Sequence, residues 1–123
     1  MDDHPCQYVY AGQRYGCSTS LAMDLIGGKW KSVLLYHLLG GERRFSELRR
    51  LAAPITERTL SLQLKQLEGS GLVSRHVHTA RPPLKVTYRL TPLGEGAGPA
   101  VRAIAEWGGR LAEEHGAIVP REG

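Results

Sequence analysis

The stretch TERTLSLQLKQLEGSGLV, residues 56–73, predicts an amphipathic helix that leads into a strand. Thr56 is suited to the N-cap of this helix, and Gly69 or Gly71 is suited to end it. Successive residues of an α-helix lie about 100° apart around its axis. One face is therefore apolar and consists of Leu60, Leu64 and Leu67. Leu62 breaks this pattern, because it lies on the polar side that the other leucines leave to solvent.

The opposite face of this helix carries side chains of the types that bind DNA. It consists of Arg58, Leu62, Lys65 and Gln66, with Thr59 and Gln63 on its flank. Arginine can hold guanine through two hydrogen bonds, glutamine can read adenine, and threonine or leucine can touch a thymine methyl group. We expect base contacts from Arg58, Thr59, Leu62 and Gln63. The alternatives for Leu62 are a contact with another protein and an isolated apolar residue at the surface.

A hairpin is predicted directly after this helix. The hydrophobic period changes to two at Leu72, which indicates strands over residues 72–78 and 84–90. The connecting segment TARPP is too long for a two-residue turn, and its two prolines stiffen a loop from which Arg81 projects. We expect several basic side chains of the helix and hairpin to meet DNA phosphates. They are Lys65, Arg75, Arg81, Lys85 and Arg89.

Two helices are predicted in the first third of the chain. The first covers residues 18–26, with Ser18 or Thr19 as its N-cap and a Gly-Gly pair at its end. The second covers residues 29–39 and also ends at a Gly-Gly pair. The apolar stripe of the second helix is Trp30, Val33, Leu34, His37 and Leu38.

A short helix and a terminal helix complete the prediction. The short helix opens at Phe45, with Ser46 as its N-cap, and ends before Pro54. The terminal helix covers residues 99–114. Two short helices joined by a tight turn and followed by a hairpin are typical of the winged helix-turn-helix, whose second helix enters the major groove. The expected fold is thus α+β and mostly helical, a winged helix-turn-helix with additional helices at both ends.

The size and composition of the chain are those of one domain. We expect an N-terminal tail over residues 1–17, the winged-helix domain over 18–115 and a C-terminal tail over 116–123. The longest apolar run, VLLYHLL at residues 33–39, is far shorter than the ~20 residues that span a bilayer. The N-terminus also lacks the basic and apolar regions of a secretory signal, so a cytoplasmic protein without a membrane segment is expected.

Basic residues are concentrated in the middle of the chain. Residues 29–55 hold six basic and two acidic side chains, and residues 56–90 again hold six and two. The flanking segments, residues 1–28 and 91–123, each carry more acidic than basic side chains. This distribution is typical of a segment that binds nucleic acid, the alternative being a basic face that keeps the protein soluble.

Five motifs of the chain resemble the HxlR family of winged-helix transcriptional regulators, in the same order and at similar spacing. They are IGGKW (26–30), RFSELRR (44–50), LKQLEGSGLVSR (64–75), VTYRLTPLG (86–94) and EWG (106–108). The resemblance implies a homodimer that binds double-stranded operator DNA, with the first and last helices forming most of the dimer interface. The corresponding apolar residues here are Leu21, Leu25, Val101, Ile104, Trp107 and Leu111.

The sequence departs from the family pattern at three places. The family often has tyrosine at the position of His78, an acidic residue at Thr87 and proline at Ser18. His78 and Thr87 belong to the hairpin. The resemblance therefore supports DNA contacts of the hairpin less directly than those of the helix.

The chain has two cysteines, Cys6 and Cys17, which are too few for a disulfide framework and lack zinc-site spacing. Cys17 resembles the N-terminal cysteine that senses oxidants, quinones or aldehydes in some HxlR-like regulators. A thiolate at the positive end of a helix reacts selectively, so Cys17 is the redox-sensing candidate. The alternative is a small residue buried at the dimer interface. Cys6 is either a resolving partner for Cys17 or without a role.

Enzyme activity, a metal and a cofactor are not expected. His76 and His78 point to one face of their strand, but a third ligand is not evident. The sequence also shows no Ser/His/Asp set, phosphate loop or paired carboxylates that would indicate catalysis.

Three functions remain open from the sequence. The first is a homodimeric, sequence-specific DNA-binding regulator, with repression favoured over activation and a switch by thiol modification at Cys17. The second is a regulator that responds to a small aromatic ligand, held between the helices that carry Trp30 and Trp107. The third is a winged-helix module that binds an acidic protein through the same face, with Leu62 as an anchor.

Overall fold

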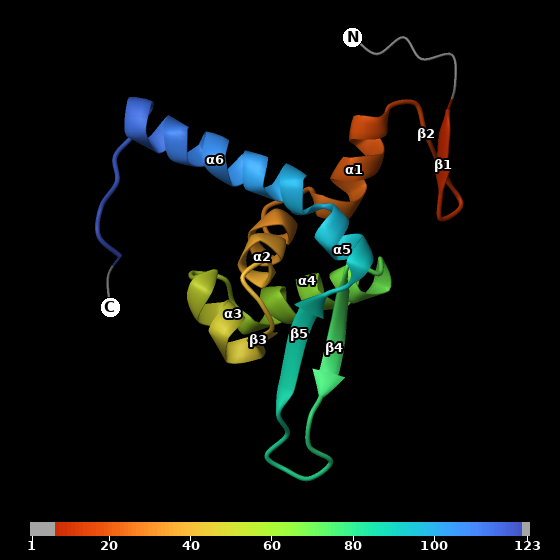
Figure 1. Cartoon of the computed structure of the whole chain (residues 1–123), viewed down its shortest axis with the longest axis vertical. Coiled ribbons are helices and arrows are strands. Elements are labelled where there is room, and N and C mark those ends of the chain that lie inside the picture. The colour runs from red at the N-terminus through yellow and green to blue at the C-terminus, as the bar shows by residue number, and fades with distance from the viewer. Residues whose placement is uncertain (1–6, 122–123) are drawn as a thin grey trace.

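The computed structural model describes residues 7–121, and its fold is the predicted winged helix (Figure 1). Helices α1 and α6 lie at one end of the molecule, and the tip of the hairpin β4–β5 lies at the other. The elements in chain order are β1 (Tyr8–Tyr10), β2 (Gln13–Tyr15), α1 (Ser18–Ile26), α2 (Lys31–Leu38), β3 (Arg43–Arg44), α3 (Phe45–Leu51), α4 (Glu57–Gly69), β4 (Val73–Val77), β5 (Val86–Leu90), α5 (Pro92–Gly96) and α6 (Gly98–His115).

The helix of the opening stretch, α4, forms as its sequence predicts. The side chain of Thr56 caps it by accepting the backbone N–H of Thr59 at 3.2 Å. Its apolar face is fully buried and consists of Leu60, Leu64 and Leu67. These leucines join side chains of α2, α3 and the hairpin in one core. Leu35 of α2 is also buried there, although the predicted stripe of that helix omitted it.

The predicted helix starts need three corrections. Cys17, rather than Ser18 or Thr19, is the N-cap of α1, and it makes no side-chain capping bond. Arg44, rather than Ser46, is the N-cap of α3, where the Glu47 carboxylate accepts the Arg44 N–H at 2.8 Å. Helix α2 begins two residues later than predicted, because Gly28 adopts a φ of +80° in a turn that precedes the helix.

Three strands of the sheets were not predicted. Strand β3 pairs with β5, so that the hairpin is part of a three-stranded antiparallel sheet in the order β3-β5-β4. Strands β1 and β2 form a second hairpin within the segment expected to be a tail. This hairpin contacts α1, where the Tyr15 hydroxyl donates to Asp24 at 2.6 Å, and this hydrogen bond raises the pKa of Tyr15.

The chain after the hairpin turns through an additional short helix, α5, before α6 begins. Thr91 caps α5 by accepting the backbone N–H of Gly94 at 3.1 Å. Gly94 is required at this point, because a Cβ atom there would lie 2.1 Å from the carbonyl oxygen of Leu72. Between residues 7 and 121, no helix has the length and apolar character needed to cross a membrane.

Candidate nucleic-acid interface

The outward face of α4 presents the side chains that the sequence assigned to DNA. Arg58, Leu62 and Lys65 are exposed, and Leu62 retains 52% of its accessible surface. Thr59 and Gln63 are partly buried, in agreement with their predicted place on the flank. The α4 helix thus has a buried leucine face and an outward face of mixed basic, polar and apolar character.

Contacts with neighbouring helices fix both ends of α4. At its start, Glu57 lies 3.4 Å from Arg49 of α3. Near its end, Lys31 Nζ of α2 donates to the side-chain oxygen of Gln66 at 2.8 Å. Pairs as exposed as Arg49 and Glu57 add little to stability. The geometric effect of the two contacts is to fix the orientation of α4, and with it the direction of its outward face, relative to α2 and α3.

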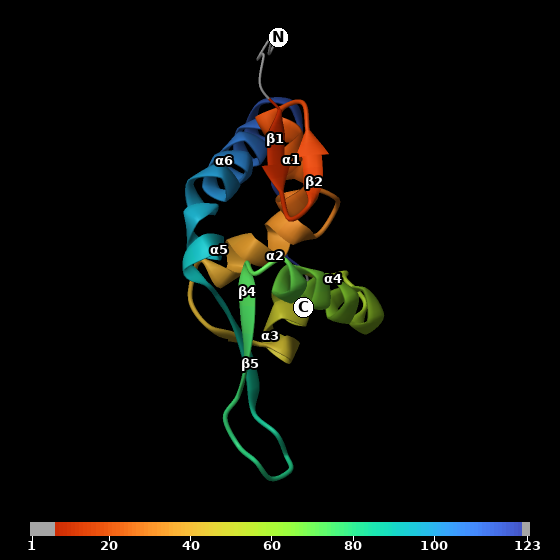
Figure 2. The same ribbon diagram turned by 90° about the vertical axis from the view of Figure 1, so that its right-hand side faces the viewer.

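The wing is the hairpin β4–β5 together with its loop, residues 78–85. Its basic residues Arg81 and Lys85 are exposed, and the Thr79 hydroxyl braces the loop through the Lys85 N–H at 3.1 Å and the Pro83 carbonyl at 3.3 Å. Figure 2 shows α4 projecting from one side of the molecule, between the α1–α6 end and the tip of the wing.

The strand register separates two basic residues that the sequence analysis grouped together. Arg75 pairs with Tyr88, and Ser74 pairs with Arg89. Because Tyr88 is buried and directly paired residues share a face of the sheet, Arg75 lies on the core-facing side of the wing and Arg89 on the outer side. Arg89 Nη1 lies 3.8 Å from the Glu42 carboxylate. Of the residues predicted to meet phosphate, Arg89 is therefore the one that the geometry supports least.

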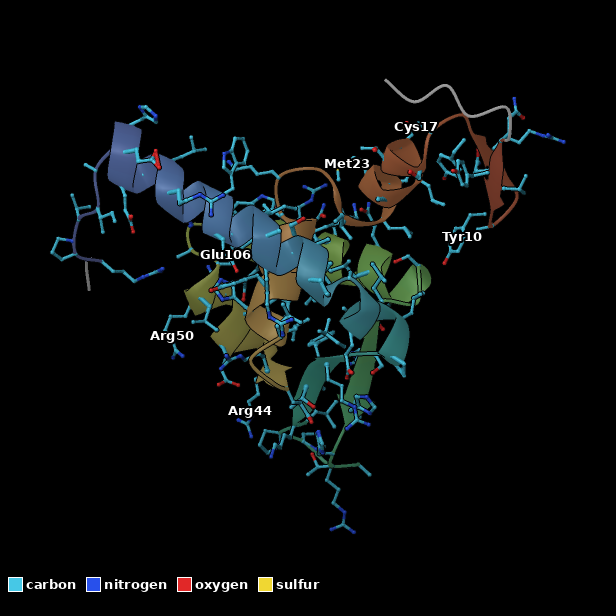
Figure 3. All side chains as sticks on the ribbon, turned by 45° about the horizontal axis from the view of Figure 1, so that its top comes forward. Tyr10, Cys17, Met23, Arg44, Arg50 and Glu106 are labelled. Atoms are coloured by element: carbon cyan, nitrogen blue, oxygen red, sulfur yellow. The ribbon has the colours of Figure 1, made fainter. Side chains whose placement is uncertain are left out.

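Arg44 is a basic residue near the wing that the sequence analysis did not select. It is exposed and lies at the start of α3 (Figure 3). Together with Lys85 of the wing it lines a hollow of ≈ 290 Å³. No local signal in the sequence places these two cations together. Their proximity results from the pairing of β3 with β5.

The other end of the molecule carries an exposed apolar face. On α6, Ile104 is 44% exposed, Trp107 59% and Leu111 41%. Leu21 and Leu25 of α1 are partly buried. Val101 requires a correction, because it is 2% exposed and belongs to the core of the subunit itself. A side chain with so little accessible surface has almost none to bury against a partner.

Cys17 lies at the start of α1, beside the hairpin β1–β2 (Figure 3). It is a free, partly buried thiol. Its backbone carbonyl accepts the N–H of Ser20 at 3.1 Å and the N–H of Leu21 at 3.3 Å. The other candidate thiol, Cys6, lies outside the described residues.

An open hollow of ≈ 620 Å³ lies between α2 and α6, and its wall includes Tyr36, His37, Arg43, Arg102 and Glu106. Figure 3 shows Glu106 on the side of α6 that faces α2. Neither tryptophan lines this hollow, so it differs from the predicted ligand site. Partial burial, with smaller contributions from Arg43 and Arg121, lowers the pKa of His37. Over residues 7–121, no cluster of three or more His, Cys, Asp or Glu side chains could hold a metal ion.

The comparisons with known proteins agree with the winged helix-turn-helix fold. The family model of the HxlR-like helix-turn-helix matches residues 25–116. The chain belongs to this HxlR-like family. Among the proteins similar to this chain is the HTH-type transcriptional regulator YybR of Bacillus subtilis (strain 168), which is 47% identical over 93 residues, covering 76% of this chain and 74% of YybR. YkvN of the same organism is 42% identical over 102 residues, covering 83% and 86%. The protein is thus a transcriptional regulator of helix-turn-helix type.

Solved structures confirm the winged-helix fold of this HxlR-like regulator. The redox regulator HypR in its oxidised form superposes with a TM-score of 0.72 at 45% identity, covering 76% of this chain and 96% of HypR. The reduced form of HypR superposes with a TM-score of 0.73 at 43% identity, covering 77% of this chain and 93% of HypR. The reduced form of the regulator YodB from B. subtilis superposes with a TM-score of 0.64 at 26% identity, covering 82% of this chain and 96% of YodB. The family match begins after residue 24, so β1, β2 and Cys17 precede it.

Proposed function

We propose that this HxlR-like regulator binds operator DNA as a homodimer and reads its sequence through α4. The observation that carries the proposal is the outward face of α4, where exposed Arg58 and Leu62 stand beside Lys65 while the opposite face is anchored in the core. Arg58, Thr59, Leu62 and Gln63 approach base edges in the major groove. The α4 helices of two subunits occupy successive major grooves about 34 Å apart.

The wing supplies contacts to the flanking phosphates in this proposal. Lys65, Arg75, Arg81 and Lys85 meet the backbone, and Arg44 adds a cation beside Lys85. Such contacts release counterions, so the affinity falls steeply as the salt concentration rises. Arg89 contributes less, because the Glu42 carboxylate lies 3.8 Å from its guanidinium.

Arg58→Ala and Lys85→Ala test this division of roles. We expect Arg58→Ala to reduce the preference for operator over random DNA by about 1–3 kcal/mol, because it removes a base contact. Lys85→Ala is expected to weaken binding to both DNAs alike and to lower the salt slope by about one. Fluorescence anisotropy, with an operator selected from random duplexes by the wild-type protein, measures both effects. If neither variant differs from wild type, the proposed interface is wrong.

We further propose that the dimer forms through α1 and α6 and that thiol modification at Cys17 switches DNA binding. Supporting the dimer are the exposed Ile104, Trp107 and Leu111, which follow one side of α6. Supporting the switch are the partly buried free thiol at the N-cap of α1 and the similarity to HypR, which is described as a redox regulator in two oxidation states. Cys17 is the N-cap of α1, one of the two helices of the proposed dimer interface. Its modification therefore changes how the two subunits meet and how far apart their α4 helices lie. We favour repression as the sense of regulation.

Diamide treatment followed by DNA titration tests the thiol switch. We expect the oxidant to weaken operator binding by the wild-type protein and to leave Cys17→Ser unaffected, since serine keeps the size of the side chain without its redox chemistry. The response of Cys6→Ser to diamide shows whether the oxidant also acts through Cys6. An equal response of Cys17→Ser and wild type would rule out switching through Cys17.

Two alternative functions make different predictions. A small-ligand-responsive regulator gains thermal stability when an aromatic compound binds, which a screen by thermal shift would detect. The hollow of ≈ 620 Å³ between α2 and α6 is not the site predicted for such a ligand, because neither Trp30 nor Trp107 lines it. A protein-interaction module would use Leu62 as an anchor for an acidic protein and would not bind duplex DNA at physiological salt.

A further inference from the structure

An acidic side chain, Glu42, lies beside the basic wing and bonds to strand β5 and to the first residue of the wing loop. Its Oε2 atom lies 2.9 Å from His78 Nε2 and accepts a hydrogen bond from the Thr87 hydroxyl. Its Oε1 atom lies 3.8 Å from Arg89 Nη1. We call Glu42, His78, Thr87 and Arg89 the Glu42 cluster. These four residues join the turn after α2 to β5 and to the residue that follows β4.

The cluster holds the wing on the face opposite the core. Thr87 and Arg89 flank buried Tyr88 along β5, so their side chains project from the opposite, outer face of the sheet. On the core-facing side, packing ends near Val86, since Val77 and Leu84 are 50% and 54% exposed. Beyond that point a two-stranded ribbon has few contacts to fix its direction. The Glu42 cluster therefore acts where the packing of the wing ends.

The cluster also relates the wing to α4 through α2. Glu42 follows the C-terminal turn of α2, where Arg43 Nε donates to the His37 carbonyl at 3.2 Å. At the other end of α2, Lys31 bonds to Gln66 of α4 at 2.8 Å. The buried side of α2 packs in the same core as α4. Helix α2 is thus a common frame, with the recognition helix held near its start and the wing held near its end.

Electrostatics alone would oppose an acidic residue at this position, because a carboxylate near DNA repels phosphate. Hydrogen bonds from Thr87 and His78 lower the pKa of Glu42, because they stabilise the charged form of its carboxyl group. The other charged groups that line the adjoining hollow of ≈ 480 Å³ are Arg89, Glu95 and Arg102. Glu95 is an exposed acidic residue that lines the same hollow. Within the described residues its side chain makes no bond to the wing, so it serves as a matched control.

We propose that Glu42 is a positioning residue for DNA binding, which fixes the direction of the wing relative to α4 through His78 and Thr87. The proposal rests on the proposed DNA-binding function. It predicts that removing the negative charge of Glu42 weakens DNA binding, whereas a purely electrostatic role predicts stronger binding. The two explanations thus differ in the sign of the effect.

Anisotropy titrations of the full chain with the selected operator test this inference. We expect Glu42→Gln to weaken binding about three- to tenfold, in line with the loss of one charged hydrogen-bond acceptor. Glu95→Gln is expected to bind as tightly as wild type or more tightly, because it only removes a negative charge. Thr87→Val, which removes the donor without changing the net charge, is expected to weaken binding like Glu42→Gln, and Thr87→Ser to retain the wild-type affinity.

Double-mutant cycles locate the effect in the wing. The losses from Glu42→Gln and Lys85→Ala are expected to be less than additive, because a misdirected wing has already lost the Lys85 contact, whereas those from Glu42→Gln and Arg58→Ala are expected to add. Hydrogen exchange provides a readout without DNA, since the His78 N–H that donates to Lys85 at 2.7 Å should exchange faster in Glu42→Gln while α4 amides do not change.

The outcomes separate this inference from the proposed function. Stronger or unchanged binding by Glu42→Gln, with a clear loss in Arg58→Ala, would overturn the positioning role and leave the DNA-binding function in place. A lack of effect from Arg58→Ala and Lys85→Ala would contradict the proposed function itself. Faster exchange throughout Glu42→Gln, including α4, would show a loss of stability and would also overturn the positioning role.

Discussion

Trp107→Glu is expected to convert the protein into a monomer and to lower its affinity for a two-half-site operator about 10²- to 10⁴-fold, because the advantage of binding two sites at once is lost. Trp107 is the most exposed of three large apolar side chains on one side of α6. Helix α6 extends away from the rest of the molecule beyond its first turns (Figure 1). The part of α6 beyond these turns is short enough to be only marginally stable in water as an isolated helix, so a partner that covers its apolar side would stabilise it.

Gly109→Glu is the matched control for this prediction. It introduces the same charge about 200° around the helix axis from Trp107. A Cβ atom at Gly109 would meet no other atom within 4 Å, so the substitution fits the subunit. We expect Gly109→Glu to remain dimeric in light scattering and to bind DNA like the wild type. A dimeric Trp107→Glu, or a monomeric form that binds the operator with undiminished affinity, would contradict the proposed interface.

Leu64→Ala is expected to lower the free energy of unfolding by about 2–5 kcal/mol, which is a large part of the roughly 5–15 kcal/mol of a typical domain. Leu64 is 1% exposed and lies in the core between α2, α3 and the hairpin. Its truncation leaves a cavity under the recognition helix, since the neighbouring buried side chains refill it only in part. Urea unfolding at one fixed protein concentration measures the effect, because the stability of a dimer depends on concentration.

Leu62→Ala, two residues earlier on the same helix, is expected to give the opposite combination of effects. Because Leu62 is 52% exposed, its truncation should change the free energy of unfolding by no more than about 0.5 kcal/mol. Its specific affinity for the operator is expected to fall while nonspecific binding does not change. Comparable destabilisation by Leu62→Ala and Leu64→Ala would show that the two faces of α4 do not have separate roles.

The features that could be predicted from the sequence are those set by neighbouring residues. The buried and outward faces of α4 follow from the spacing of its leucines, and its cap follows from the oxygen of Thr56. The strands β4 and β5 follow from alternation, although each is shorter than predicted. The capping prediction failed at Ser18 and Ser46, because a serine near a helix start is a cap only if the backbone enters the helix just after it.

Other features of the interface depend on contacts between distant parts of the chain. The exposure of Arg44 beside Lys85 follows from the pairing of β3 with β5, and a two-residue strand has no periodicity that a sequence could reveal. Val101 fits the same helical spacing as Ile104, but packing of the start of α6 on the subunit buries Val101 and leaves Ile104 exposed. Periodicity identifies apolar residues and does not distinguish the subunit core from an interface.

By itself, the sequence determined the recognition helix, the wing and the concentration of basic charge around them, because helical and strand periods and local caps are encoded over a few residues. Only the tertiary structure decided that Arg44 lies beside Lys85 and that Glu42 meets His78 and Thr87, which are 36 and 45 residues away along the chain. The physical reason is that a hydrogen bond depends on a separation of about 3 Å in space, and residues so far apart in sequence reach it only when the sheet has formed.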